Sequence, residues 1–388
     1  MKKLAFFISN YTIGNSPSLL NLIEYLGKIY SVTLFLKDVA LIPKDLHFKV
    51  KRVIKNRKRY LLLFWITSHI PVTNIFDIYL TVDPHGFYWC KMLFPKSKPI
   101  YYSLELYIKD DHFGLDYSDD ICNFERKNIN DIKGLIIQSK GKGDLFLKEY
   151  NLTNKIPVFY IPVTYNGHSD NEKSNYLKDK YIISSEKKIA LHLGGIAEWY
   201  SCMEIAREFS KIENWVLVFH GYKSTEYLLK FKKYIQDNKF INIIISDEVF
   251  DNIDEVDKIL KSCDIGIAWY NDISVGFRMA GKSSGKISAY LKHGLPVITN
   301  NYPESIDAIQ NKQVGVCINT IDQISLAVES IIKKYDFYSS NAMKEYEENY
   351  NFEKYKLTLF NYIEKVSRKD KWMGNKTNLE YWEEGYDK

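Results

Sequence analysis

The sequence of 388 residues contains no long hydrophobic run and few cysteines. Its longest uninterrupted apolar stretch, residues 61–66, is far shorter than the roughly 18–20 residues that span a bilayer. The cysteines are scattered along the chain at Cys90, Cys122, Cys202, Cys263 and Cys317. They form no CxxC pair and no cluster with histidine, which argues against a zinc site and against a disulfide framework. We therefore expect a chain without membrane spans in a reducing compartment.

Targeting and charge signals are also weak. The first eight residues imitate a signal peptide, but the apolar stretch stops at Ser9 and no small-residue cleavage site follows, so we expect a cytoplasmic protein. A net charge of +5 without a recognisable motif argues against nucleic acid as a partner. The basic run Lys49–Arg59 is either a solvated face or a docking surface for an anionic membrane, where each cation contributes about 1 kcal/mol.

Apolar strands alternate with amphipathic helices along most of the chain, which predicts parallel, doubly wound α/β sheets. Predicted strands are Lys3–Ile8, Ser31–Leu36, Asp77–Val82, Pro99–Leu104, Gly134–Gln138, Val158–Ile161, Lys188–Leu193, Trp215–His220, Ile241–Ile245, Asp264–Trp269, Pro296–Thr299 and Val314–Ile318. One predicted helix begins at Pro17, and the others cover residues 121–132, 199–210, 224–237, 253–262, 284–293, 303–310, 321–334 and 340–367.

The length fits two domains of about 150–200 residues. A polar stretch, Tyr165–Lys180, is typical of a linker. We predict two Rossmann-like domains that face a cleft, residues 1–165 and 181–345, and a helical tail, 346–388, that packs back towards the first domain.

Ligands of such sheets bind beyond the carboxyl ends of the strands, so the loops after strands are the candidate sites. Gly194-Gly195-Ile196 follows one predicted strand and would let a phosphate approach the backbone. His220 and Gly221 follow the next strand, with Lys223 close behind. Both segments are equally compatible with ordinary tight turns.

The strongest signal is Ser283-Ser284-Gly285-Lys286, a polar loop that runs into a helix. Hydroxyls, free N–H groups and a lysine at a helix N-terminus are what a diphosphate requires. A solvated loop capped by serine is the plainer alternative. Residues 276–283 also match the G-x-x-x-x-G-K-[ST] phosphate loop, but they do not follow a strand directly.

Three features carry a resemblance: two Rossmann-like halves, Gly194-Gly195 after the first strand of the second half, and a helix followed by Gly294-Leu295-Pro296-Val297. Together they resemble the GT-B glycosyltransferases, and most closely the bacterial enzymes of family four. The likeness covers the whole chain in architecture and is specific mainly over 188–318. Family four usually carries two glutamates separated by seven residues. Gly281 and Ala289 stand in their places here, and Ser-Ser-Gly-Lys forms a variant.

The resemblance implies transfer of a sugar from a nucleoside diphosphate, with UDP favoured, to a glycan, lipid-linked or protein acceptor, as in bacterial surface-glycan assembly. Lys286, Ser284, Gly285 and the Gly194-Gly195 turn would bind the diphosphate, and Asp247, Glu248 and Val249 would lie at the base. We expect no metal and no further cofactor, because the cationic loop would stabilise the leaving group. Glu105 is the candidate general base of an inverting enzyme, and the acceptor-side candidates are Gly14, Asn15, Asp83, His85 and Arg278.

Two other functions stay open on the residues alone. A P-loop-like NTPase would depend on Lys282, and a non-catalytic sugar-nucleotide-binding protein would bind UDP without releasing sugar. A dehydrogenase is disfavoured, because the loop Ser9–Ser16 lacks G-x-G-x-x-G.

Overall fold

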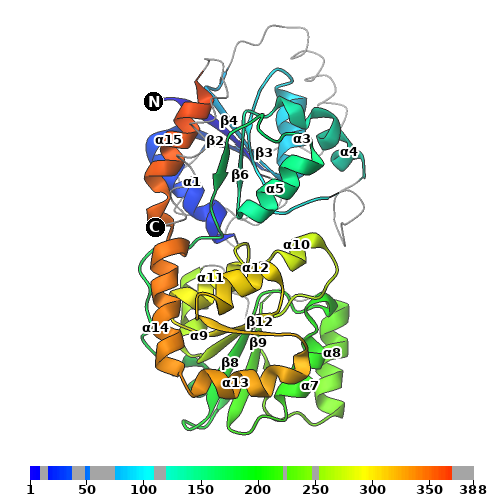
Figure 1. Ribbon diagram of the computed structural model, residues 1–388, viewed down its shortest axis with the longest axis vertical. Helices are drawn as coiled ribbons and strands as arrows, with labels where there is room; N and C mark the ends of the chain where they lie inside the picture. Colours follow the sequence, from blue (N-terminus) through cyan, green and yellow to red (C-terminus); the bar gives the residue numbers. More distant parts are fainter. Residues whose placement is uncertain are drawn as a thin grey trace. The chain divides into compact units, whose positions relative to one another are not determined.

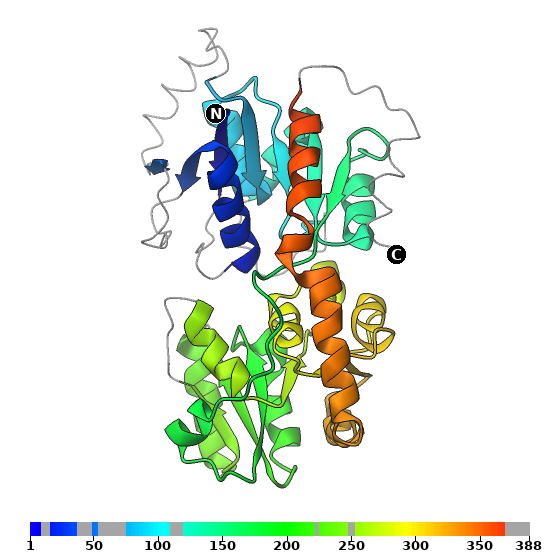
Figure 2. The same ribbon diagram turned by 90° about the vertical axis from the view of Figure 1, so that its left-hand side faces the viewer.

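The computed structural model describes residues 1–8, 16–36, 49–52, 75–108, 119–221, 225–246 and 253–368. The chain forms two compact units (Figures 1 and 2). Unit 1 is Met1–Pro162 with Lys354–Lys388, and unit 2 is Val163–Glu353. The predicted boundaries at 165 and 346 differ slightly from these. Unit 2 already begins at Val163, and residues 346–353, which were predicted to start the tail, still belong to unit 2.

A parallel sheet of seven strands forms unit 1, in the order β3-β2-β1-β4-β5-β6-β7. Its central strands are buried along almost their whole length, as expected for a sheet covered on both faces. The strands are β1 (Lys3–Phe7), β2 (Ser31–Leu36), β3 (Lys49–Arg52), β4 (Ile78–Val82), β5 (Ile100–Tyr102), β6 (Gly134–Ile137) and β7 (Val158–Tyr160).

Helices lie on both faces of this sheet, with α1 and α15 on one side and α3 and α5 on the other (Figure 1). Their bounds are α1 (Pro17–Ile29), α3 (Asp83–Leu93), α4 (Asp119–Asn128), η2 (Ile129–Asp131), α5 (Lys140–Glu149) and α15 (Lys356–Ser367). The tail helix α15 is tied to the sheet by the Tyr362 hydroxyl, 2.9 Å from the Leu135 carbonyl and 3.0 Å from that of Pro157. It is tied to α1 by Tyr25, whose hydroxyl donates to the Lys356 carbonyl.

Unit 2 contains a six-stranded parallel sheet in the order β10-β9-β8-β11-β12-β13. The strand order reverses between β8 and β11, which is the switch point where ligands of doubly wound sheets bind. The strands are β8 (Lys188–Leu193), β9 (Trp215–His220), β10 (Ile243–Ile245), β11 (Ile265–Ala268), β12 (Val297–Asn300) and β13 (Gly315–Ile318).

Two hydrophobic clusters cover the two faces of this sheet. Residues of α9, α11 and α14 form the cluster on one face, and residues of α7, α8 and α13 form the cluster on the other. The helical segments are α6 (Tyr176–Tyr181), η3 (Glu198–Tyr200), α7 (Cys202–Phe209), α8 (Thr225–Asp237), α9 (Ile253–Lys261), α10 (Val275–Arg278), α11 (Gly285–Lys292), α12 (Pro303–Ser305), η4 (Ile306–Gln310), η5 (Ile321–Gln323), α13 (Ile324–Ile332), α14 (Tyr335–Glu345), η6 (Tyr346–Tyr350) and η7 (Phe352–Lys354).

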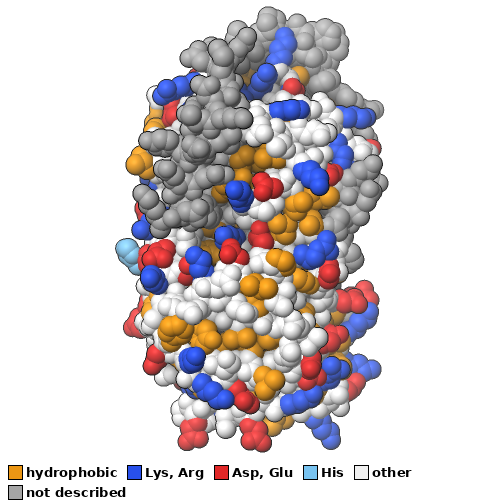
Figure 3. Space-filling view, in the orientation of Figure 1, with side chains coloured by type: hydrophobic (Ala, Val, Ile, Leu, Met, Phe, Trp, Pro, Cys, Tyr) orange, Lys and Arg blue, Asp and Glu red, His pale blue; other side chains and the backbone are white. Residues whose placement is uncertain are grey.

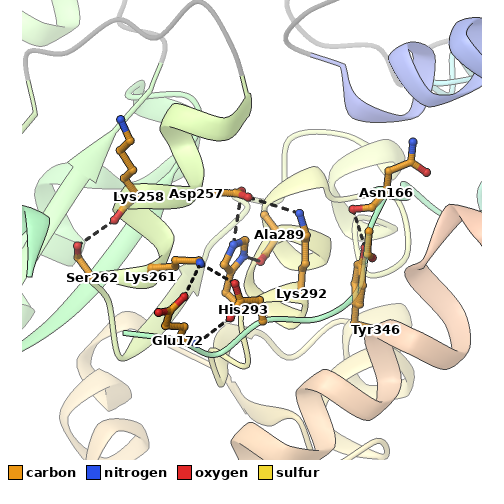
Figure 4. Close-up of polar contacts among 12 residues, drawn as sticks. Asn166, Glu172, Asp257, Lys258, Lys261, Ser262, Ala289, Lys292, His293 and Tyr346 are labelled. Carbon is orange, nitrogen blue, oxygen red and sulfur yellow. Dashed lines mark hydrogen bonds and ion pairs between the residues drawn. The ribbon is translucent and has the colours of Figure 1, made fainter. Parts of the chain in front are cut away.

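The predicted linker, 165–180, is an integral part of unit 2. Tyr165 N donates to the Tyr350 carbonyl, and the Tyr346 hydroxyl lies 2.9 Å from the Gly167 carbonyl. Lys261 of α9 forms an ion pair with Glu172 at 3.3 Å (Figure 4). Polar composition alone suggested a linker, whereas these contacts bind the segment to η6 and α9.

The surface shown in Figure 3 has no broad patch of one charge in its described part, because Lys and Arg side chains alternate with Asp and Glu. Among the described residues, no helix combines the length and the apolar character needed to cross a membrane. Of the basic run Lys49–Arg59, the first four residues form β3 and the rest lies outside the described residues. Its docking to a membrane therefore stays a prediction.

Candidate functional site

The ends of β8 and β9 approach each other so closely that glycine is required at both. Gly194 and Gly221 have φ angles of +104° and +142°, which L side chains rarely adopt. The Gly194 N–H donates to the His220 carbonyl at 2.8 Å, and a Cβ atom on Gly221 would lie 2.2 Å from the Gly194 oxygen. The two predicted glycine turns therefore form one continuous backbone surface at the carboxyl edge of the sheet.

Helix α11 brings Lys286 to this surface. Its Tyr290 ring packs over Gly266 of β11, where a Cβ atom would lie 2.2 Å from the ring. The Tyr290 hydroxyl accepts from Leu193 N at 2.8 Å and lies 2.9 Å from the Leu191 carbonyl. This anchoring fixes the first turn of α11 beside the end of β8.

The far end of the same helix is fixed by a second polar cluster (Figure 4). The His293 Nδ1 donates to the Ala289 carbonyl at 2.9 Å, and its Nε2 lies 3.4 Å from the Asp257 carboxylate of α9. Lys292 lies 3.5 Å from the same carboxylate, and these basic neighbours hold the pKa of Asp257 below its ordinary value against the effect of burial. Both ends of α11 are thus held by neighbouring elements.

Lys286 is buried with its ammonium group next to the glycine turn. A methyl group on Gly194 would lie 3.9 Å from the Lys286 Nζ. The Nζ lies 4.1 Å from the Tyr200 ring centre and 4.9 Å from the Tyr270 ring centre, within the range of cation–π attraction. Among the residues that the structure describes, none accepts a hydrogen bond from it.

Burial lowers the Lys286 pKa to about 7, because the charged form loses water and gains no anionic partner in exchange. Two aromatic faces only partly replace the lost hydration. An anion placed beside this ammonium would restore the missing interaction, and the N-terminus of α11 would contribute in the same direction. The arrangement is therefore suited to binding a negatively charged group.

Ser284 is the N-cap residue of α11. Its hydroxyl accepts from Ile287 N at 3.2 Å and forms a hydrogen bond with the Tyr270 hydroxyl. The Ser283 hydroxyl donates to the Met279 carbonyl at 3.0 Å. Both hydroxyls therefore have a structural partner, and Ser284 also links α11 to the tyrosine beneath Lys286.

Two buried histidines lie near the glycine turn. Burial and the nearby Lys286 hold the His192 pKa well below its ordinary value, and its Nε2 donates to the Gly195 carbonyl at 3.0 Å. The His220 Nδ1 lies 3.0 Å from the Ser246 hydroxyl in a buried position. The His192 ring is thus a neutral polar contact, and Lys286 is the cation closest to the glycine turn described above.

The acceptor-side candidates that the structure describes belong to unit 1, apart from Arg278. Asp83 is buried with a φ angle of +52°, and its Oδ1 accepts from Leu104 N at 2.8 Å and Glu105 N at 3.2 Å. Asp83 and the buried His85 lie in the first turn of α3, not in the loop that the sequence suggested. The Glu105 side chain is exposed at its surface. Loss of water from the protein side raises the pKa of its carboxyl group, and the positive charge of Lys142 offsets part of that rise.

Several predicted residues lie elsewhere. The Ile196 side chain is fully buried in the core, so only its backbone is left for the predicted ligand contact. Arg278 forms an ion pair with Asp272 at 2.5 Å. The candidates outside the described residues are Gly14, Asn15, Lys223, Asp247, Glu248 and Val249.

The phosphate-loop match over 276–283 is not a strand–loop–helix element. Its first residue lies in α10, which follows the end of β11 after several residues, and the Lys282 ammonium pairs with Asp307 at 3.2 Å. A P-loop places its lysine free to reach a phosphate directly after a strand. The geometry therefore argues against the NTPase interpretation.

Sequence reasoning missed the aromatic residues Tyr200 and Tyr270, and also His192. Tyr270 is the second residue after β11, and Tyr200 ends the short helix η3 that follows β8, so both lie in segments that follow strands. That position was the available signal. Within the described ranges, His, Cys, Asp and Glu side chains nowhere gather in groups of three or more that could hold a metal ion.

Comparison with known proteins shows which fold these two sheets form. Residues 218–358 match the family model described as "Glucosyltransferase 3-like, C-terminal domain". HepE from Anabaena, solved in complex with UDP and glucose, has a TM-score of 0.72 at 11% identity, and the match covers 94% of this chain and 100% of that chain. The chain has the GT-B fold.

Other GT-B structures match equally broadly. Sucrose-phosphate synthase from Thermosynechococcus elongatus has a TM-score of 0.70 at 10% identity over 94% of this chain and 99% of that chain. The lipopolysaccharide outer core galactosyltransferase WaaB has a TM-score of 0.64 at 15% identity, with the same coverage of each chain. No curated protein sequence matches the chain.

The structure also explains why this GT-B chain lacks the two glutamates of family four. A Cβ atom on Gly281 would lie 2.4 Å from the Glu304 carbonyl oxygen, so the backbone leaves no room for a side chain. Ala289 is fully buried in the core on the inner side of α11. Both positions are packing positions here.

Proposed function

We propose that this protein is a glycosyltransferase that takes a sugar from a nucleoside diphosphate, with UDP as the favoured nucleotide. One observation carries the proposal: Lys286 is buried at the glycine turn of the second sheet, without a hydrogen-bond partner among the described residues. The GT-B fold and the glucosyltransferase-like family model over 218–358 supply the reaction class. That HepE was solved with UDP-glucose supports the choice of donor.

The chemistry follows from the charge that develops on the leaving group. When the bond between the sugar and the diphosphate breaks, the second phosphate gains negative charge. The Lys286 ammonium and the first N–H groups of α11 would stabilise that charge without reorganising, since they are already fixed in place. We therefore propose a reaction that needs no metal ion and no further cofactor.

Glu105 is the proposed general base for the acceptor hydroxyl. Its side chain is exposed, and its raised pKa brings a carboxylate closer to the range in which it accepts a proton efficiently. The Asp83 carboxylate accepts hydrogen bonds from Leu104 N at 2.8 Å and from Glu105 N at 3.2 Å, which hold the backbone at Glu105. The acceptor is proposed to be a glycan, a lipid-linked sugar or a protein, and a lipid-linked acceptor would make the basic run at Lys49–Arg59 the membrane contact.

Binding and turnover test this proposal separately. Thermal unfolding of the full chain is followed with UDP, GDP, CMP and dTDP and with their sugar conjugates. A ligand present at 100 times its Kd stabilises the protein by about 2.7 kcal/mol. Release of UDP from UDP-sugars, with and without candidate acceptors, then measures transfer and the slower hydrolysis of the donor.

Each alternative has its own outcome. A UDP-dependent shift without any sugar release would support the non-catalytic binding protein. Magnesium-dependent hydrolysis of ATP or GTP that is lost in Lys282→Ala would support an NTPase. Stabilisation by a UDP-sugar together with UDP release supports the glycosyltransferase.

A further inference from the structure

Unit 2 contains a second feature at its sheet edge, a cavity of about 250 Å³ beyond the carboxyl ends of β11, β12 and β13. Trp269 and Asn300 form its buried part, and Asp272, Asn301 and Asn319 are exposed at its rim. Lys286 is not among its lining residues. The cavity is therefore distinct from the proposed anion site, which consists of Lys286 and the glycine turn at Gly194.

Amide groups supply much of the hydrogen-bonding capacity of this cavity. Asn300 uses its Oδ1 to accept from Tyr270 N at 2.7 Å, and Asn301 uses its Nδ2 to donate to the Asn319 Oδ1 at 2.6 Å. Within the described part of the chain, the opposite ends of these amides (Asn300 Nδ2, Asn301 Oδ1 and Asn319 Nδ2) have no partner. Two donor groups and one acceptor thus remain for a ligand.

The charges around the cavity disfavour an ionic ligand. Of the described residues that line it, none is lysine or arginine, which disfavours phosphate. The rim carboxylate of Asp272 is already paired with Arg278 at 2.5 Å, which disfavours a cation. The expected ligand is uncharged and carries groups that both donate and accept hydrogen bonds, as hydroxyl groups do.

Size and shape narrow the ligand further. Cavities for drug-sized ligands usually have about 300–1,000 Å³, so this cavity suits a smaller molecule. The aromatic side chains of Trp269 and Tyr302 line it, and they can pack against the C–H face of a sugar ring.

We propose that this cavity binds one uncharged sugar ring. The inference rests on the proposed function for the chemical class of its ligand and deepens it. Tyr270 connects the two sites: its ring lies under the Lys286 ammonium, while its backbone N–H and carbonyl are bonded to Asn300 and Tyr302 of the cavity. A sugar in the cavity is the sugar of the donor or a sugar of the acceptor.

Ligand-detected saturation-transfer NMR on the full chain tests the cavity, with D-glucose, D-galactose and N-acetyl-D-glucosamine as probes. At least one probe should receive saturation from the wild-type protein. Asn319→Leu and Asn301→Leu change exposed rim residues and should reduce the signal at least fivefold. Asn311→Leu replaces an exposed asparagine away from the cavity and should leave it unchanged. UDP affinity, measured by calorimetry, should be the same in all of these variants.

Competition separates the two sources of the sugar. Displacement by UDP-glucose and not by UDP identifies the sugar of the donor, whereas displacement by neither identifies a sugar of the acceptor. The absence of saturation transfer from all three sugars, an equal signal in Asn319→Leu, or displacement by UDP itself would overturn the proposal. Sugar binding that is lost in Asn319→Leu, together with no UDP binding at all, would keep the cavity and reject the proposed function.

Discussion

The ammonium group of Lys286 lies 4.1 Å from the centre of the Tyr200 ring and, among the described residues, donates no hydrogen bond. A buried charge without an ionic or hydrogen-bonded partner lowers the stability of the fold. Such a group is retained where a ligand supplies the partner, because function then outweighs the loss of stability. The first three predictions concern this lysine.

Lys286→Met should weaken UDP binding by about 1.5–3 kcal/mol, or roughly 10- to 150-fold, the usual contribution of a hydrogen bond to a charged group. Methionine keeps the length and apolar stem of lysine, so the melting temperature of the ligand-free protein should be equal to or higher than that of the wild type. Calorimetry gives the affinity and thermal unfolding gives the stability. Lys282→Met, which removes the ion pair with Asp307, is the matched control and should bind UDP normally. Unchanged affinity in Lys286→Met would remove this lysine from the site.

The pKa of Lys286 near 7 makes UDP binding dependent on pH. The free protein holds this lysine mostly deprotonated at pH 8, and a bound diphosphate favours its charged form, so binding should take up a proton between pH 7.5 and 9. Affinity should fall as the pH rises through this window. Calorimetry in buffers of different ionisation enthalpy measures the uptake directly. In Lys286→Arg the side chain stays charged throughout, and the pH dependence should disappear.

The same shift changes folding stability with a defined sign. The pKa of Lys286 is lower in the folded state than in the unfolded chain, so the unfolded chain binds more protons between about pH 7 and its ordinary pKa of 10.5. The contribution of this lysine to the free energy of unfolding therefore rises with pH across that range. The difference between wild type and Lys286→Met should become smaller as the pH rises.

The sequence predicts much of the proposed anion site because its signals are local. A strand that ends in Gly194-Gly195, and a serine cap followed by Gly285-Lys286 at a helix start, are short-range patterns with a direct physical meaning. Their meeting follows from topology, since parallel strands end at one edge of the sheet. The close approach of Lys286 to Gly194 confirms that expectation.

Other features depend on contacts distant in sequence and could not be predicted. Tyr270 and Tyr200 are 70 residues apart, and only the packed sheet places both rings beside one ammonium. The side chain of Ile196 belongs to the core because the chain turns inward after the glycines, which a sequence pattern does not specify. The strand at Lys49–Arg52 was missed because its charged residues suggested a solvated face or a membrane-docking surface instead of a sheet edge.

Gly221→Ala should destabilise the protein by about 1–3 kcal/mol, from the strained backbone conformation and the forced contact with Gly194. The new methyl group would lie 2.2 Å from the carbonyl oxygen of Gly194. This oxygen belongs to the backbone, so it cannot rotate out of the way as the end of a flexible side chain can. Gly285→Ala is the control, because its methyl group would meet only Val163 at an ordinary 3.7 Å. Chemical denaturation should show equal stability or a small gain for Gly285→Ala. Equal stability of both variants would contradict the observed turn geometry.

Transfer should persist when divalent metal ions are removed. Lys286 and the start of α11 are proposed to stabilise the leaving diphosphate, so EDTA should change the rate less than twofold. The assay follows UDP release from the active UDP-sugar in metal-free buffer, with and without added Mn²⁺ or Mg²⁺. Loss of activity in EDTA that either ion restores would show that a metal, and not the lysine alone, neutralises the leaving group.

Glu105→Gln should abolish most of the transfer if this carboxylate is the general base. Glutamine keeps the size and the hydrogen-bonding oxygen but cannot take up the acceptor proton, so kcat should fall about 10²–10⁴-fold while UDP affinity stays the same. The raised pKa of Glu105 predicts that wild-type kcat falls on the acid side of neutrality as the carboxyl becomes protonated, and this limb of the pH profile should vanish in the variant. Glu186→Gln, at another exposed glutamate, is the control and should change neither kcat nor the acid limb of the pH profile.

The stereochemistry of the product decides between the two roles open to Glu105. A general base acting on the acceptor in a single displacement gives inverted anomeric configuration, which NMR of the product detects. Retained configuration, or a Glu105→Gln variant within a few-fold of wild type, would make Glu105 an acceptor contact and leave the leaving phosphate to take the proton. The missing glutamates at Gly281 and Ala289 make this measurement decisive, because the packing at both positions excludes the carboxylates that family four usually carries there.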